Sequence, residues 1–259
     1  MPGFESFSPA VLAWIGAVVI LAGLIQGTLG FGFPLVATPL VAMATDIRTA
    51  VITVLLPTLA TTVATMATSG PLRPVLARFW AMPLYAIAGS LVGTWIFVAA
   101  PEAPYALLLA VIIIVYLNID RFTHGSWPLV QRHERAIAPM AGLTGGLFEG
   151  TVNVAAPPLI MYYLALGLAP ATLVQALCIC FIVGKTTQFG VLTLQGGVSA
   201  TQWLATLPFA ALGVMTFFAG ARIRNRIDAM TFRVWVKRAL FGIALVLLAQ
   251  FAYTRWLRT

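Results

Sequence analysis

The stretch GLFEGTVNVAAPP, from Gly146 to Pro158, decides how this chain folds. It lies inside a long apolar segment, yet it contains the carboxylate of Glu149, the amide of Asn153 and several helix-breaking residues. Glycine and proline interrupt helices, and a charge at membrane depth is costly enough to suggest a function. The stretch therefore predicts a helix that breaks inside a membrane, beside a polar site.

The composition is that of a protein embedded in a lipid bilayer. The 259 residues are 61% hydrophobic and 8% charged, with a mean hydropathy of +0.98, whereas soluble domains are about 25% charged. A helix of about 20 apolar residues crosses a hydrocarbon core of about 30 Å. We therefore predict an all-α polytopic membrane protein. The candidate spans are residues 49–68, 79–100, 171–194, 201–220 and 234–253.

The net charge of +8 has a different meaning in a membrane protein than in a soluble one. An excess of Lys and Arg marks cytoplasmic loops there, and without a long basic run we expect no nucleic-acid partner. Cys178 and Cys180 are two residues apart, so on a helix they face different ways and form neither a disulfide nor a metal motif. We expect no metal, no cofactor and no catalytic residue.

An internal repeat organises the chain. AGLIQGTLG at 22–30 is similar to AGLTGGLFE at 141–149, an offset of 119 that also relates Pro39 to Pro158. This similarity predicts two transmembrane repeats, residues 1–120 and 136–259, which together form one transport domain. A polar cytoplasmic linker over residues 121–135 joins them. Each repeat is expected to begin with a broken, re-entrant pair of half-helices, 10–44 and 136–166, and to continue with three transmembrane helices.

The distribution of basic residues predicts that the two repeats are inverted. If each broken segment enters and leaves on one side, the basic loops at 73–78, 121–135 and 222–233 share a side, and the uncharged loop at 195–200 lies opposite. This is the positive-inside pattern, and it places both termini outside a bacterial cytoplasmic (inner) membrane. Arg255 and Arg258 at the C-terminus argue against that orientation.

The two helix breaks predict an anion-binding site. Irregular backbone at membrane depth is tolerated only where protein or a polar cavity surrounds it. Pro34 suits the first turn of one re-entrant helix and Asn153 suits an N-cap of the other. Both helix N-termini then direct partial positive charge and free N–H groups at the bilayer midplane. The candidate substrate-binding residues at the breaks are Gln26, Gly27, Thr28, Gly30, Phe31, Gly32, Phe33, Gly146, Glu149, Gly150, Thr151 and Asn153.

Lys185 adds a positive charge to this site. It lies well inside the span 171–194, within VGKTTQFG, where Thr187 and Gln188 are further candidate ligands. A cation at membrane depth is functional by default. Two alternatives remain: Lys185 extends to a membrane interface, or it only pairs with Glu149.

Glu149 is the candidate for proton coupling. A carboxylate beside an anion repels it, and protonation removes the repulsion, so a buried glutamate can couple a proton to an anion. A purely structural ion pair with Lys185 is the alternative.

Two segments resemble a known family. GLIQGTLGFGFPLVATPLV (23–41) and GLTGGLFEGTVNVAAPPLIMYYLALGLAP (142–170) are similar to the sulfite exporter TauE/SafE family, also called the 4-toluene sulfonate uptake permease family. This chain departs from the family where Phe31 and Phe33 interrupt a frequent glycine triplet and where Ala155 and Ala156 precede the prolines; these bulkier residues narrow or reshape the pocket. The positions that match the family's two breaks are Gly27, Gly30, Gly32, Gly142, Gly146, Gly150, Pro157 and Pro158.

The resemblance implies a secondary transporter of a small sulfur-containing anion, such as sulfite, an organosulfonate or sulfoacetate. We expect coupling to protons or to the membrane potential, with the anion at the midplane between the two breaks. The alternatives are a carrier for another small organic anion such as a carboxylate, and a passive anion channel. An enzyme is not expected, because the sequence contains neither HExxH nor GxSxG. We expect the anion and the lipid bilayer as partners, and a homodimer is possible from the sequence.

Overall fold

The computed structural model describes residues 7–118, 127–195, 197–224 and 241, and every regular element within them is a helix. This confirms the prediction of an all-α polytopic membrane protein. The expected span 234–253 and both chain termini fall largely outside the described residues. Five helices are long and apolar enough to cross a membrane: α1 (Pro9–Leu29), α3 (Ile47–Ala67), α5 (Met82–Ala99), α11 (Pro170–Leu194) and α12 (Ala200–Ile223).

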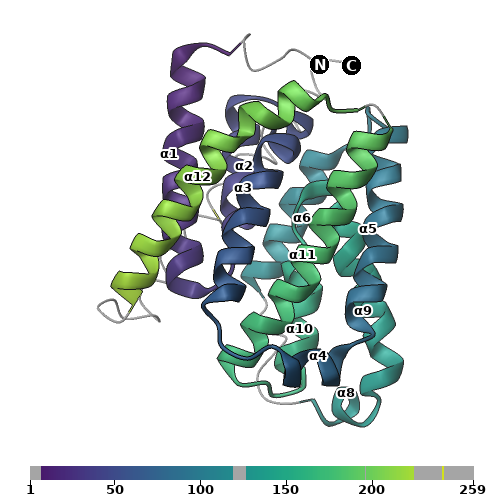
Figure 1. Cartoon of the computed structure of the whole chain (residues 1–259). Helices are drawn as coiled ribbons and strands as arrows, with labels where there is room; N and C mark the ends of the chain where they lie inside the picture. Colours follow the sequence, from purple (N-terminus) through teal and green to yellow (C-terminus); the bar gives the residue numbers. More distant parts are fainter. Residues whose placement is uncertain (1–6, 119–126, 196, 225–240, 242–259) are drawn as a thin grey trace.

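Shorter helices complete the described part of the chain. α6 (Tyr105–Leu117) is apolar throughout and follows α5. α8 (Pro128–Arg132) lies within the predicted polar linker, near its end. α4 (Arg73–Phe79) connects α3 to α5 at the same end of the bundle as α8 (Figure 1).

Both predicted helix breaks are present. In the first repeat α1 ends at Gly30 (φ 83°), and α2 (Phe33–Ala44) begins after Gly32 (φ 112°). These left-handed conformations favour glycine because it has no Cβ. In the second repeat α9 (Glu134–Val152) is followed by α10 (Ala156–Ala165).

The first helix of each broken pair is longer than predicted. α1 has 21 residues and α9 has 19, so each is about 30 Å long at 1.5 Å per residue. Neither is a half-helix. Each break therefore lies near the far end of its first helix, and only the second helix of each pair is short.

Each broken pair returns to the end of the bundle from which it started. In the first pair, the indole N–H of Trp14 near the start of α1 donates to the carbonyl of Leu40 near the end of α2 (2.9 Å). In the second pair, the backbone N–H of Trp127, just before α8, donates to the carbonyl of Ala165 at the end of α10 (3.2 Å). Entry and exit at one end are what the re-entrant arrangement requires.

The two pairs approach α3 from opposite ends. Gln26, beside the first break, donates to Thr65 near the C-terminal end of α3, whereas Asn153, at the second break, donates to Val51 near its N-terminal end. The breaks therefore lie about 21 Å apart along α3 at 1.5 Å per residue. Opposite orientation is what inverted repeats need. The inverted repeat itself stays a prediction, because the last helix of the second repeat lies outside the described residues.

Contacts between helices relate the two halves by an offset of 123 residues rather than 119. Gly30 and Asn153 are the left-handed residues that end α1 and α9. Asn153 bonds the carbonyl of Val51, and a Cβ at Gly30 would lie 2.9 Å from Val174, the residue 123 positions after Val51. The offset of 119 taken from the sequence is therefore four residues, about one helical turn, too short. Both offsets align glycine with glycine, because the glycines are spaced four residues apart.

A second pair of contacts supports the same offset. Ser90 of α5 donates to the carbonyl of Gly184 in α11 (2.8 Å). The residues related to these by 123 positions also meet, because a Cβ at Gly213 of α12 would lie 3.2 Å from Thr61 of α3. Each half therefore packs its helices against the other half in an equivalent way.

Small residues let the first helix of each broken pair lie close to a span of the other half. A Cβ added at Gly146 or Gly150 of α9 would collide with the backbone of α5, at 2.5 Å from the Ser90 carbonyl oxygen in the case of Gly150. Gly27 of α1 meets the backbone of α12 at Phe217 in the same way. Close backbone approach of this kind stabilises helix pairs in membranes, where the hydrophobic effect between helices is absent.

We expect Gly150→Ala to destabilise the folded protein by about 1–3 kcal/mol, because the added methyl group forces α9 away from α5. Thermal unfolding in detergent measures the change. Gly190→Ala is the matched control, since a Cβ at Gly190 of α11 meets nothing within 4 Å. An equal loss of stability in both variants would show that the α9–α5 contact is not responsible, because alanine in place of an uncrowded helical glycine is expected to stabilise a helix.

Candidate anion-binding site

Lys185 and Glu149 form an ion pair in the interior of the protein. Lys185 is 0% exposed and Glu149 is 1% exposed, and the lysine Nζ lies 2.8 Å from the glutamate Oε1. The Lys185 ammonium is the group that this oxygen contacts. The alternative in which Lys185 extends to a membrane interface does not fit this geometry.

Two amide side chains complete the surroundings of the Lys185 ammonium. Nζ donates to Oδ1 and to the main-chain carbonyl of Asn153, and to Oε1 of Gln188 (3.3 Å). Gln188 in turn donates to the carbonyl of Gly150 (3.2 Å), and Asn153 donates to Val51 (2.9 Å). We call Glu149, Asn153, Lys185 and Gln188 the Lys185 cluster. The bonds that Asn153 and Gln188 donate to the carbonyls of Val51 and Gly150 hold each amide with its oxygen toward the ammonium.

The other oxygen of Glu149 binds the N-terminus of α10. Oε2 accepts a hydrogen bond from the backbone N–H of Ala155 (3.0 Å), the residue that caps α10. The predicted role of Asn153 as N-cap of this helix is wrong. Asn153 instead ends α9 in a left-handed conformation (φ 67°), which asparagine tolerates better than most residues.

The first break carries an uncharged version of the same arrangement. Oε1 of Gln26 accepts from the backbone N–H of Phe33 at the start of α2 (3.0 Å), and its amide nitrogen donates to Thr65 (3.0 Å). The offset of 123 relates Gln26 to Glu149, Thr62 to Lys185 and Thr65 to Gln188. Thr65 was not among the predicted site residues, and the correct register would have found it.

The structure holds the predicted residues in two groups, not one. Gln26, Gly30 and Phe33 lie beside Thr65, whereas the Lys185 cluster lies about 21 Å away along α3. The expectation that a single anion touches both breaks is therefore not met in this conformation. Of the two groups, only the Lys185 cluster contains a cation.

Several candidate residues serve helix structure instead. The hydroxyls of Thr28, Thr151 and Thr187 each donate to a carbonyl of their own helix three or four residues earlier. Phe31 packs against the hydrophobic core beside the first break. Gly27, Gly32 and Gly146 provide close packing or a turn, as described above. Among the candidate residues, those of the Lys185 cluster combine burial with contact to a charge, and the backbone N–H of Ala155 joins them through Glu149.

Comparison with protein families gives one match. The family model described as Sulfite exporter TauE/SafE matches residues 15–250, nearly the whole chain, and includes both helix breaks and Lys185. No curated protein and no solved structure matches the chain.

Proposed function

The chain belongs to the sulfite exporter TauE/SafE family, a family of membrane transporters for sulfur-containing anions and not of enzymes, and we propose that it is a proton-coupled carrier whose anion binds at the Lys185 cluster. The observation that carries this proposal is the position of the Glu149 carboxylate. The carboxylate contacts both the Lys185 ammonium and the N-terminus of α10, which are the two groups that a bound oxyanion would contact.

Glu149 acts as an internal stand-in for the transported anion. A sulfite or sulfonate group presents negatively charged oxygens that accept hydrogen bonds, as a carboxylate does. A helix N-terminus favours such a group through its free N–H groups and its dipole. The substrate therefore binds by displacing Glu149 from Lys185 and Ala155.

Charge balance links this displacement to a proton. With Glu149 ionised and paired with Lys185, the cluster is neutral. If a monoanion binds while Glu149 is ionised and Lys185 is protonated, the cluster carries one negative charge in excess. An uncompensated buried charge is strongly unfavourable. Protonation of Glu149 restores neutrality, so one proton accompanies each monoanion. The cluster is then neutral both with and without substrate.

The proposed orientation follows from the ends of the bundle. Arg73, Arg78, Arg132 and Arg135 all lie around α4 and α8, at one end (Figure 1). The positive-inside pattern supports a cytoplasmic location for this end. The second break then lies toward the outer side of a bacterial inner membrane, and alternating access proceeds by motion of one repeat against the other.

The test is uptake into proteoliposomes that contain the purified full-length protein. We expect saturable uptake of sulfite, sulfoacetate or an aromatic sulfonate, driven by an inwardly directed proton gradient and absent with sulfate. Uptake of small carboxylates alone would contradict the sulfur specificity. Flux that does not saturate and ignores the proton gradient would indicate the passive channel instead.

A further inference from the structure

A polar hollow lies at the arginine-rich end of the bundle, where α4 meets α5 and α8 meets α9. Its volume is about 1030 Å³. It is separate from the Lys185 cluster, because Glu134 on its wall and Glu149 are 15 residues apart on α9, about 22 Å at 1.5 Å per residue. The polar side chains that line it include Arg78, Gln131, Arg132, His133, Glu134 and Arg135.

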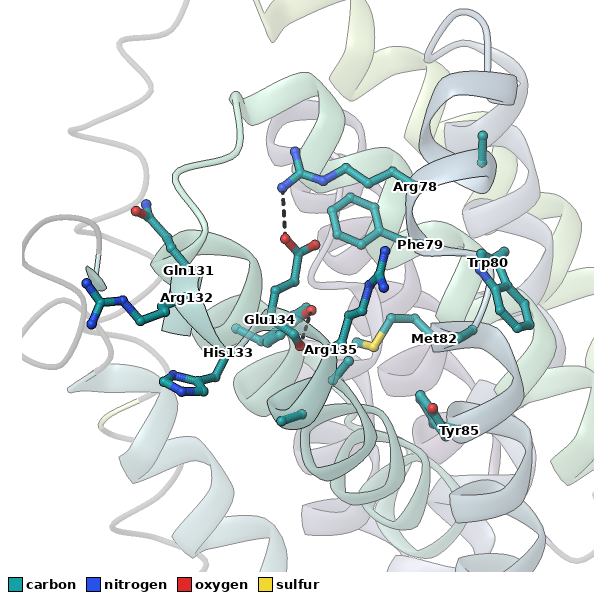
Figure 2. A pocket seen from close by; sticks show the side chains of 15 residues that line it. Arg78, Phe79, Trp80, Met82, Tyr85, Gln131, Arg132, His133, Glu134 and Arg135 are labelled. Carbon is teal, nitrogen blue, oxygen red and sulfur yellow. Dashed lines mark hydrogen bonds and ion pairs between the residues drawn. The ribbon is translucent and has the colours of Figure 1, made fainter. Parts of the chain in front are cut away.

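The hollow carries an excess of positive charge. Three arginines line it against one carboxylate, Glu134, which pairs with Arg78 (3.3 Å). Among the described residues neither Arg132 nor Arg135 has an ion-pair partner. In Figure 2 the guanidinium group of Arg78 lies above the Glu134 carboxylate, that of Arg135 lies to the right of it, and that of Arg132 lies farther away to the left. Guanidinium groups bind the oxygens of a phosphate in pairs, which an ammonium does less well.

Exposed apolar side chains next to the hollow indicate its depth in the membrane. Trp80 on its wall is 66% exposed, and Leu84 and Met140, one turn from lining residues, are 54% and 65% exposed. Tryptophan collects at the boundary between headgroups and hydrocarbon. The hollow therefore opens where lipid headgroups meet acyl chains, on the side that carries the basic loops.

We propose that this hollow binds the headgroup of an anionic phospholipid, with the phosphate at Arg78 and Arg135 and the acyl chains beside Trp80. Basic pockets between transmembrane helices on the cytoplasmic side are suited to such headgroups. The volume is far larger than a sulfite-sized anion needs, and the apolar edge gives a lipid a contact that a soluble anion cannot use. This site does not depend on the transport mechanism proposed above.

The test is thermal unfolding of the purified full-length protein in detergent, titrated with phosphatidylglycerol or with phosphatidylcholine. We expect phosphatidylglycerol alone to raise the unfolding temperature. Arg135→Gln and Arg78→Gln should each weaken the apparent affinity about fivefold. Arg73→Gln is the matched control, because Arg73 begins α4 at the same end without lining the hollow, and it should respond as the unchanged protein does.

If the Arg78→Gln protein does not fold because its ion pair with Glu134 is lost, the measurement on Arg135→Gln alone tests the proposal. An equal weakening in Arg135→Gln and Arg73→Gln would overturn the proposal, since it would indicate attraction to the whole basic end. Equal stabilisation by phosphatidylcholine would also overturn it. Stabilisation by inorganic phosphate at the same concentration, lost in Arg135→Gln, would assign the hollow to a soluble anion instead of a lipid.

Discussion

We expect the replacement of Lys185 by methionine to abolish anion binding and to destabilise the folded protein by about 3–5 kcal/mol. The lysine is the only cation that contacts Glu149 among the described residues, and both side chains are buried. Without it, Glu149 stays buried with an unpaired charge or must take up a proton. Thermal unfolding measures the loss of stability, and the substrate-induced rise in unfolding temperature measures binding, because a ligand stabilises the state that binds it.

The double variant Glu149→Gln/Lys185→Met separates the two effects. It removes both charges, so most of the lost stability should return, as replacement of a whole buried ion pair is close to neutral. Anion binding should stay absent, because the ammonium is missing. Binding by Lys185→Met that equals that of the unchanged protein would leave Lys185 as no more than a structural partner of Glu149.

We expect the replacement of Glu149 by glutamine to make anion binding independent of pH. If one proton enters with each monoanion, as proposed, the affinity of the unchanged protein should fall about tenfold for each unit of rising pH above the range where Glu149 is protonated in the empty protein. Glutamine has nearly the same shape and its oxygen can still accept from Ala155, but it carries no charge that competes for Lys185. Affinity measured from pH 5 to pH 8 shows the difference.

Glu134→Gln is the control for this experiment. Glu134 lies on the same helix, but it pairs with Arg78 at the end of the bundle, with its side chain 30% exposed. Its variant should keep the pH dependence of the unchanged protein. If Glu149→Gln also keeps that dependence, proton coupling through Glu149 is excluded and the ion pair is structural.

Composition and local pattern predicted α3, α5, α11 and α12 closely, whereas α1 was expected to be only a half-helix. The predicted span 49–68 is α3 (Ile47–Ala67), and 79–100 contains α5 (Met82–Ala99). Both helix breaks were also predicted. These features depend on the transfer of one segment into lipid and on residues that cannot continue a helix, so neighbouring residues in the chain are sufficient to predict them.

The sequence also contains the correct register between the halves, because GLIQGT (23–28) and GLFEGT (146–151) align at an offset of 123, but the alignment at 119 was chosen instead. Gly142, Gly146 and Gly150 repeat every four residues, so a shift of one turn aligns glycine with glycine again. Contacts such as that of Asn153 with Val51 select the offset of 123. That register shows the first break to be a neutral counterpart of the second, with Thr62 at the position of Lys185.

The sequence by itself determined that the chain spans a membrane, where its helices break, and that Glu149 and Lys185 are charges needing a partner at depth. Only the tertiary structure decided that these two pair with each other and that Thr187 bonds its own helix. It also decided that the two breaks lie about 21 Å apart and not together. The physical reason is that burial in lipid is a property of each segment, whereas contacts between side chains depend on how deep and at what rotation each helix packs against its neighbours.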